Sequence, residues 1–510
     1  MRNPAPARKP HGATENGGRG THPFFTVSPC ASGLFSVPVF ATPPVHFGFA
    51  ASMTERFQLI EADPASAVPV TVLAESELEA WLNGQPPAIA GWVKAQGFKG
   101  KAGDVLALPG ANGSPARVLA GRAAEAPEIW RIAGLAAALP EGSYRLDGGA
   151  DPQAAALGWA LGAYRFERYK ADKRPRPKLV WPAGIDRTEV LRLAGAIHRA
   201  RDLVNTPAGD LGPSALAAAV EEVGRAHGAK VKVIAGDELL KQGYRAIHAV
   251  GRAAADPPRL ADLVWGDAAK PKLTLVGKGV CFDTGGLDLK TAGGMQMMKK
   301  DMGGAATALG LAEAIMAAKL PVRLRLLIPA VENSVAGNAY RPLDVIPGRN
   351  GKTIEIGNTD AEGRVILSDA LVEASKEKPA LLLDFATLTG AARVALGPEL
   401  PALFANDDAL GEALLKHGRA ADDPMWRLPL WPGYRSLVEG ETADLTNSPE
   451  GGMAGAITAA LFLEAFVEKG IPWAHFDTFA WNQKARPGRP KGGEALLLRA
   501  CDAMIRERFA

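Results

Sequence analysis

The feature that most constrains the fold is a regular alternation of apolar and helix-like segments beyond residue 186. Short apolar runs such as KVKVIAG (230–236), KLTLVGKGV (272–280) and ALLLDFATLTG (380–390) are separated by segments with helical periodicity. Continuous apolar strands are typical of sheets buried on both faces, and strands separated by helices pair in parallel. The alternation therefore predicts an α/β fold with a central, mostly parallel sheet flanked by helices.

Five hundred and ten residues exceed one ordinary hydrophobic core, so we expect more than one domain. Short strand-like runs and Ala-rich helical segments predict a smaller N-terminal α/β domain over 53–163. A linker over 164–186 and a larger C-terminal domain over 187–510 follow. In open α/β sheets ligands bind outside the carboxyl ends of the strands, so we expect a site there.

Residues 1–52 are rich in Pro, Gly, Ala and Ser and contain a single acidic residue, Glu15. This composition predicts a disordered extension, with Met53 opening the folded protein. A transit peptide is the alternative, because arginines are present and acids are scarce.

The segment from Tyr164 to Lys178 is basic and contains Pro175 and Pro177. A DNA-binding arm is one interpretation, but the prolines favour a solvated linker. The net charge of +3 gives no indication of a nucleic-acid partner, and no apolar run reaches the ~18 residues that cross a bilayer. Three widely spaced cysteines cannot form a disulfide framework, so we expect a reducing compartment.

Two glycine-rich segments, 276–304 (VGKGVCFDTGGLDLKTAGGMQMMKKDMGG) and 358–364 (NTDAEGR), concentrate the charged residues. Carboxylates that converge in a tight space repel one another unless cations hold them. Oxygen and nitrogen donors without thiolates suit Zn, Mn or Mg, and a shared carboxylate cluster suits two adjacent ions. The segments predict a di-metal hydrolase site built from Lys278, Asp283, Lys290, Asp301, Asp360, Glu362 and Arg364.

In type, order and spacing these residues resemble the active-site pattern of the leucyl aminopeptidases, two-zinc metallopeptidases with an NTDAEGRL signature. The resemblance runs from about Arg201 to the C-terminal helix and continues more weakly back to about Met53. It implies a metal-dependent aminopeptidase whose catalytic domain is 187–510 and whose substrates are peptides with a free N-terminus. Leu343 stands where the family has glycine, and Thr478 and Phe479 replace small residues, so a preference for leucine does not follow.

The resemblance implies two divalent ions per subunit, with Zn or Mn expected. One ion would be held by Lys278, Asp283, Asp301 and Glu362. The second would be held by Asp283, Asp360 and Glu362, so that Asp283 and Glu362 bridge. A lysine ligand must be neutral, and a neighbouring dication favours that form.

Two further residues carry catalytic roles by resemblance. Lys290 would polarise the scissile carbonyl and stabilise the oxyanion. Arg364 would hold a bicarbonate ion that acts as general base toward the metal-bridging water; a salt bridge from Arg364 to a metal ligand is the alternative. The pocket for the first substrate side chain is expected to include Met298, Thr387, Leu388 and Gly390.

Lys299 and Lys300 have no role in the family pattern and are expected to be ordinary solvated charges. Asn358 and Asp384 are expected either to support the ligands or to be structural. His475 is expected to be a core histidine rather than a ligand.

The resemblance further implies a homohexamer in the cytoplasm that acts in peptide turnover. Three alternatives remain open at this point. One is a dipeptidase-type specialist, for example for Cys-Gly, one is a DNA-binding accessory protein, and one is a catalytically inactive structural homologue. Nucleic-acid and membrane partners are not expected.

Overall fold

The computed structural model describes residues 53–110 and 113–510. The chain divides into two units, Met1–Pro43 and Pro44–Ala510, and all described residues belong to the second. The predicted extension over 1–52, with its transit-peptide alternative, lies outside the described residues.

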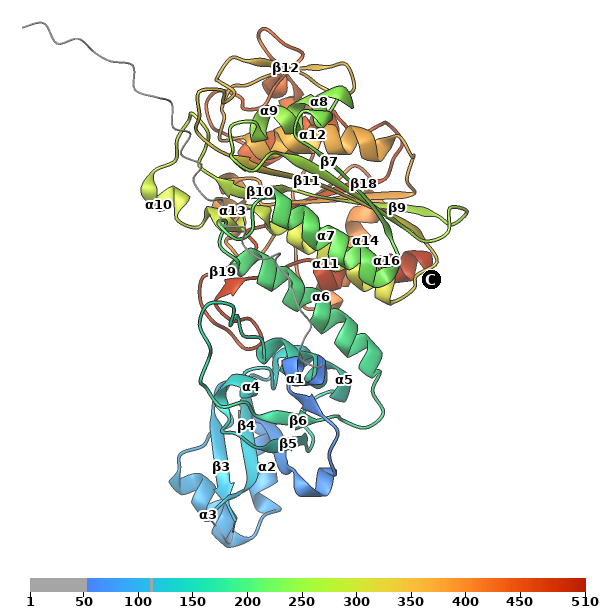
Figure 1. The fold of residues 1–510 in the computed structure, drawn as a ribbon. Coiled ribbons are helices and arrows are strands. Elements are labelled where there is room, and N and C mark those ends of the chain that lie inside the picture. The colour runs from blue at the N-terminus through green and yellow to red at the C-terminus, as the bar shows by residue number, and fades with distance from the viewer. Residues whose placement is uncertain (1–52, 111–112) are drawn as a thin grey trace, which may run out of the picture. The chain divides into compact units, whose positions relative to one another are not determined.

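The N-terminal part contains a six-stranded sheet in the order β1-β6-β5-β2-β4-β3 (Figure 1). Only the edge pair β3–β4 is antiparallel. The expected small α/β domain is thus present. Its elements are α1 (Met53–Phe57), β1 (Leu59–Ile60), β2 (Val68–Ala74), α2 (Glu75–Asn83), α3 (Pro87–Ala95), β3 (Val105–Pro109), β4 (Pro115–Arg122), α4 (Leu135–Ala138), β5 (Ser143–Leu146), α5 (Pro152–Gly162) and β6 (Lys178–Val180).

The C-terminal part is built on a nine-stranded sheet in the order β16-β15-β18-β14-β9-β11-β8-β7, with β10 paired to β11. The central strands β18, β14, β9 and β11 are mutually parallel, whereas β7, β8 and β15 join antiparallel. The prediction of a mostly parallel central sheet is confirmed. The strands are β7 (Lys230–Ala235), β8 (Arg259–Trp265), β9 (Lys272–Gly277), β10 (Gly279–Asp283), β11 (Arg323–Asn333), β14 (Leu381–Ala386), β15 (Ala402–Ala405), β16 (Trp426–Arg427) and β18 (Trp473–Asp477).

Helices cover both faces of this sheet (Figure 1). Successive residues of β14 alternate between two cores: Leu381 and Leu383 pack with α6, α7, α11, α14 and α16, whereas Leu382 packs with α9, α12 and α15. This two-residue period is the pleat of a strand buried on both sides. The helices are α6 (Arg187–Asn205), α7 (Pro213–His227), α8 (Glu238–Lys241), α9 (Arg245–Gly251), α10 (Ala292–Met295), α11 (Gly303–Ala317), α12 (Glu362–Ser375), α13 (Gly390–Leu396), α14 (Asp408–Ala420), α15 (Gly455–Glu464) and α16 (Leu498–Phe509).

Two small sheets complete the described part. One has the order β12-β13-β17 and the other pairs β19 with β20. Their strands are β12 (Val345–Pro347), β13 (Thr353–Glu355), β17 (Leu445–Thr446), β19 (Trp481–Asn482) and β20 (Gly492–Gly493).

The parallel strands end at one edge of the large sheet, and polar residues stand at those ends. Asp283 closes β10, Asn333 closes β11 and Asp477 closes β18. Lys278 and Thr387 follow β9 and β14 directly. The topology therefore gathers charged side chains where ligands bind in open α/β sheets.

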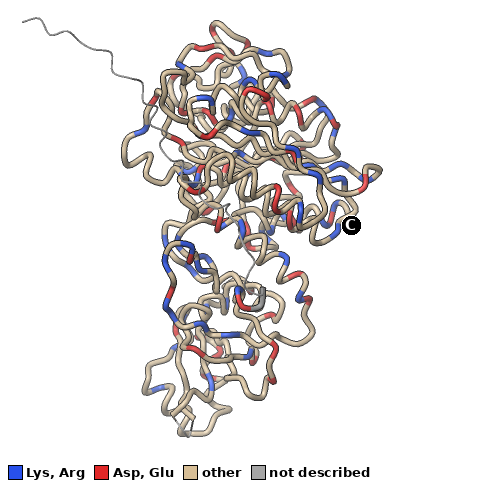
Figure 2. Tube along the Cα trace, viewed as in Figure 1, with Lys and Arg blue, Asp and Glu red and all other residues tan. Residues whose placement is uncertain are grey.

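The basic segment expected to be a linker carries its own counter-charges. Arg176 contacts Glu167 at 2.6 Å, and Arg174 pairs with Asp172. Acidic and basic residues therefore interleave along it (Figure 2). Its C-terminal end forms β6, which pairs with β5 and β1, while the domain boundaries themselves stay a prediction.

Within the described ranges, no helix has both the length and the apolar character that a membrane span requires.

Candidate active site

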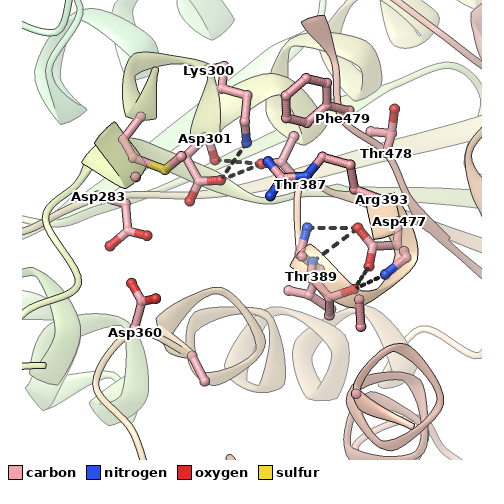
Figure 3. A pocket seen from close by; sticks show the side chains of 18 of the residues that line it. Asp283, Lys300, Asp301, Asp360, Thr387, Thr389, Arg393, Asp477, Thr478 and Phe479 are labelled. Atoms are coloured by element: carbon pink, nitrogen blue, oxygen red, sulfur yellow. Dashed lines mark hydrogen bonds and ion pairs between the residues drawn. The ribbon is translucent and has the colours of Figure 1, made fainter. Parts of the chain in front are cut away.

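A pocket of about 660 Å³ opens at the carboxyl ends of the parallel strands. Every site residue expected from the sequence lines it. These are Lys278, Asp283, Lys290, Met298, Asp301, Asp360, Glu362, Arg364, Thr387, Leu388 and Gly390. Segments that are far apart in the sequence thus meet in one cavity, part of which Figure 3 shows.

Three buried carboxylates form the floor of the pocket. Asp283 ends β10, Asp301 lies on a short 3-10 helix, η3 (Met298–Met302), and Glu362 is the first residue of α12. One oxygen from each lies within 4.8 Å of the others. Acids this close repel one another unless a cation lies between or beside them.

Lys278 is the first cation of the floor. Its Nζ lies 2.6 Å from Asp301 Oδ2 and 2.8 Å from Glu362 Oε1, and it donates a hydrogen bond to the carbonyl of Thr387. The side chain runs directly over Gly363, where an added Cβ would come within 2.5 Å of Lys278 Cε. A larger residue at 363 would therefore force the end of the Lys278 side chain to shift.

Lys290 is the second cation and joins the two glycine-rich motifs. Its Nζ lies 2.8 Å from Asp283 Oδ2 and also pairs with Asp360. The amide N–H of Asp360 donates to Asn358 Oδ1 at 2.7 Å, which fixes the loop that carries this carboxylate. Asn358 therefore positions Asp360, a candidate metal ligand, which is the first of the two roles expected for it.

Burial and neighbouring charges move the pKa values of the acids in opposite directions. Burial, together with the charge of Asp283, raises the pKa of Glu362 to about 8. Burial also works to raise the pKa of Asp301, but Lys278 and Lys300 prevail and lower it to about 2. Burial disfavours the ammonium of Lys278, yet Asp301 and Glu362 raise its pKa above the usual lysine range. The acids thus hold the proton on Lys278 until another cation competes for them.

The chemistry of the donor set fits divalent ions. Carboxylate oxygens and one amine converge, without thiolates, which suits Zn, Mn or Mg. Glu362 Oε2 is buried and receives no hydrogen bond from any group in the described part of the chain. An unpartnered carboxylate oxygen is costly to bury and is free to bind a metal.

Arg364 lies buried at the pocket wall. Its Nη1 donates to the carbonyl of Asn447 at 2.8 Å, and its Nε finds no hydrogen-bond partner among residues 53–110 and 113–510. The expected alternative, a salt bridge from Arg364 to a metal ligand, is not formed between the described residues. Burial lowers the pKa of Arg364 to about 10, so an anion near the unpartnered Nε would be favoured.

The segment over 387–390 forms one wall. Thr387 Oγ1 donates to Asp301 Oδ1 at 2.8 Å, tying this wall to the floor. The next two residues are held by Asp477, whose carboxylate accepts the N–H groups of Leu388 and Thr389 and the hydroxyl of Thr389 (Figure 3).

The expectation that Lys300 is an ordinary solvated charge is wrong. Its side chain is buried against Asp301 and Phe479, because η3 turns this residue inward beside the end of β10. Lys299 is partly buried and donates to the carbonyl of Asn205 at 2.6 Å.

Sequence reasoning also missed polar side chains that arrange the site. Asn333 donates to Asp283 Oδ1 at 2.8 Å and to the carbonyl of Thr359 at 3.1 Å. Asn447 accepts the N–H groups of Gly357 and Asn358. The place of Asn333 at the carboxyl end of a strand was an available signal, whereas Asn447 had none.

His475 and Asp384 lie outside the pocket. Both are buried and contact each other at 2.6 Å, and Trp473 donates to the same carboxylate. The expectation of a core histidine is confirmed, and Asp384 takes the structural one of its two expected roles.

Comparison with known proteins finds two family matches. Residues 198–501 match the cytosol aminopeptidase family catalytic domain, and residues 68–182 match the M17 aminopeptidase N-terminal domain. A probable cytosol aminopeptidase of Roseiflexus castenholzii is 43% identical over 365 residues, covering 67% of this chain and 74% of the relative.

Solved structures agree. The crystal structure of the cytosol aminopeptidase from Coxiella burnetii has 51% identity and a TM-score of 0.86, covering 89% of this chain and 100% of that one. The bottromycin maturation enzyme BotP in complex with Mn has 34% identity and a TM-score of 0.78, covering 87% of this chain and 100% of that one.

Proposed function

The chain belongs to the cytosol aminopeptidase family, whose members are metallo-exopeptidases. We propose that it binds two divalent ions and uses them to remove N-terminal residues from peptides. The observation that carries the proposal is the buried cluster of Asp283, Asp301 and Glu362, within 4.8 Å, beside Lys278 and Lys290. A cluster of this kind at the strand ends supports metal-assisted hydrolysis.

Lys278, Asp283, Asp301 and Glu362 would hold one ion, and Asp283, Asp360 and Glu362 the other. Zn and Mn both suit these donors, and the Mn complex of the related BotP supports Mn as one choice. When bound, two ions would supply Lewis-acid activation of a water molecule and of the peptide carbonyl.

Lys290 would present its ammonium to the oxyanion that develops on the scissile carbonyl. Its position between Asp283 and Asp360 supports this role, because those carboxylates aim the charge at the centre of the site. A preorganised positive charge stabilises the transition state more than the substrate.

Arg364 would hold a bicarbonate ion as the base that accepts a proton from the attacking water. The buried guanidinium with an unpartnered Nε supports an anion at this wall. The first side chain of the substrate would lie against Met298, Thr387, Leu388 and Gly390, which line the pocket beside these groups.

The experiment that tests the function compares aminoacyl amides with their N-acetylated forms on Zn- and Mn-loaded protein. We expect cleavage of the free-amine substrates alone, because an exopeptidase recognises the amine. Equal rates on blocked substrates would overturn the proposal.

A homohexamer in the cytoplasm is part of the proposal. Six large apolar side chains are exposed between residues 394 and 453, and burial of such side chains between copies would favour assembly. They are Val394, Trp426, Trp431, Tyr434, Leu437 and Met453. Light scattering of the metal-loaded protein tests the assembly, and the mass of a single chain would contradict it.

A further inference from the structure

Two cations share one aromatic ring at the wall of the pocket. Lys300 Nζ lies 5.2 Å from the centre of the Phe479 ring, and Arg393 Cζ lies 5.2 Å from the same centre. All three side chains line the pocket, and Figure 3 shows both cations reaching toward the space beside the ring. They come from separate elements, η3, α13 and the segment after β18.

Among the described residues, Lys300 pairs with no carboxylate that it does not share. Its Nζ lies 3.5 Å from Asp301 Oδ1, and Asp301 already pairs with Lys278 at 2.6 Å. Only 5% of Lys300 is exposed to solvent. Lysine is almost never buried to this extent unless it is paired, so the position stores an incompletely compensated charge.

Arg393 is exposed at the pocket wall and forms no ion pair with any residue of the described ranges. The nearby acid of β18, Asp477, is committed elsewhere: its oxygens accept from Leu388, Thr389 and the Thr389 hydroxyl. Within the described ranges, two cations and an apolar ring thus meet at one place, and the one acid that pairs with either cation, Asp301, is shared with Lys278.

We propose that Lys300 and Arg393 bind a carboxylate of the substrate beside Phe479, so that the enzyme selects peptides with a negative charge at this wall. The inference rests on the proposed aminopeptidase function and names its substrate class. Phe479 packs against the methylene groups that carry the carboxylate, and the two cations neutralise it. The carboxylate belongs either to the side chain of an acidic first residue or to the C-terminus of a dipeptide.

Paired substrates distinguish the two sources on metal-loaded protein. Glu-p-nitroanilide against Gln-p-nitroanilide isolates the side chain, and Leu-Gly against Leu-Gly-amide isolates the C-terminus. We expect a kcat/KM ratio of about tenfold, which corresponds to about 1.4 kcal/mol, in favour of the charged member of one pair, because hydrogen bonds to a charged group are stronger than those to a neutral one. Ratios at or below one in both pairs would overturn the inference.

Variants then test which cations produce the preference for a charged substrate. Arg393→Gln should lower the preferred ratio several-fold, and Lys300→Met should lower it further. The exposed Arg419 of α14 provides the matched control, and Arg419→Gln should leave the ratio unchanged. An unaltered ratio in Arg393→Gln would contradict the assignment even if Lys300→Met fails to fold.

Binding gives a readout that does not need turnover. Calorimetry of the metal-loaded protein should show L-glutamate binding more tightly than L-glutamine if the side chain is the source, and Leu-Gly more tightly than its amide if the C-terminus is. If no free-amine substrate is cleaved at all, the proposed function fails, while these binding pairs still decide the carboxylate site.

Discussion

Lys290 Nζ lies 2.8 Å from Asp283 Oδ2 and also pairs with Asp360, so one ammonium bridges the two glycine-rich motifs. These two ion pairs hold the Lys290 side chain at the centre of the charged floor.

Lys290→Ala should retain two divalent ions per subunit yet lose turnover by about 10²–10³-fold, as removal of an oxyanion donor typically does. The loss should fall mainly on kcat, because the developing charge is largest in the transition state. Metal analysis beside steady-state kinetics measures both quantities. The exposed Lys352 supplies the control Lys352→Ala, and loss of metal in Lys290→Ala would instead make Lys290 a structural ligand.

Asp283→Ala should lose metal from both positions, since this carboxylate would be shared. The side chain also accepts from Gly285 N at 2.9 Å and from Asn333, so its loop should loosen. Metal stoichiometry after dialysis is the measurement. Asp384→Asn, a buried change outside the pocket, should alter stability but keep the stoichiometry, and full metal content in Asp283→Ala would refute the ligand set.

Arg364→Ala should lose activity that added bicarbonate partly restores, because the proposed role of the guanidinium is to hold that anion. Lys290→Ala should show no such rescue. Rates measured across a bicarbonate series, at constant ionic strength, separate the two roles. Equal responses of both variants would mean that Arg364 does not position a base.

We expect Asp369 to make the free energy of unfolding depend on pH. This buried carboxyl on α12 accepts the N–H groups of Ala246 and Ile247, and burial raises its pKa from 3.8 to about 7. Between those values the unfolded chain ionises the group and the folded protein does not, so its stabilising contribution is complete at low pH and lost as pH rises through about 7.

Asp369→Asn should therefore flatten the decline in unfolding free energy between about pH 4 and pH 8, by up to roughly 3–4 kcal/mol. Urea unfolding of wild type and variant in the same metal concentration gives the difference at each pH. The exposed Asp408 offers Asp408→Asn as a control. Parallel profiles for wild type and Asp369→Asn would show that Asp369 does not titrate in this range.

The sequence located the floor of the site because its residues lie in two short segments whose types and spacing are unambiguous. It could not reveal that Lys300 is buried, because KKD reads as a polar run until η3 turns its second lysine against Phe479. Asn447 contacts Asn358 from a distant loop, and no local pattern encodes such a contact. The central sheet was predictable from apolar runs, whereas the three-residue strand β6 depends on β5 and β1 for its existence.

Leu343 departs from the expected family pattern at a position where the backbone is left-handed. The resemblance to the family leads us to expect glycine there, and Leu343 has a left-handed backbone with φ of 67° while its side chain is exposed. A left-handed conformation costs a non-glycine residue about 1–2 kcal/mol. Glycine avoids this strain, but its greater conformational entropy in the unfolded state cancels part of the gain in stability. Leu343→Gly should thus raise the unfolding free energy by roughly 0.5–1 kcal/mol, measurable by urea titration. A loss of stability would mean that the leucine makes an apolar contact in the assembled protein.

The amide of Asn333 contacts both Asp283 and the backbone of Thr359, and so fastens the two motifs to one strand end. A substitution that moves one motif would therefore also displace the other, so we expect few substitutions to be tolerated in the floor. Arg393, by contrast, forms no ion pair with any described residue, and its guanidinium lies over the Phe479 ring. Among related enzymes we therefore expect substrate preference to change through substitutions at the pocket wall, such as Arg393, while the carboxylates and lysines of the floor stay the same.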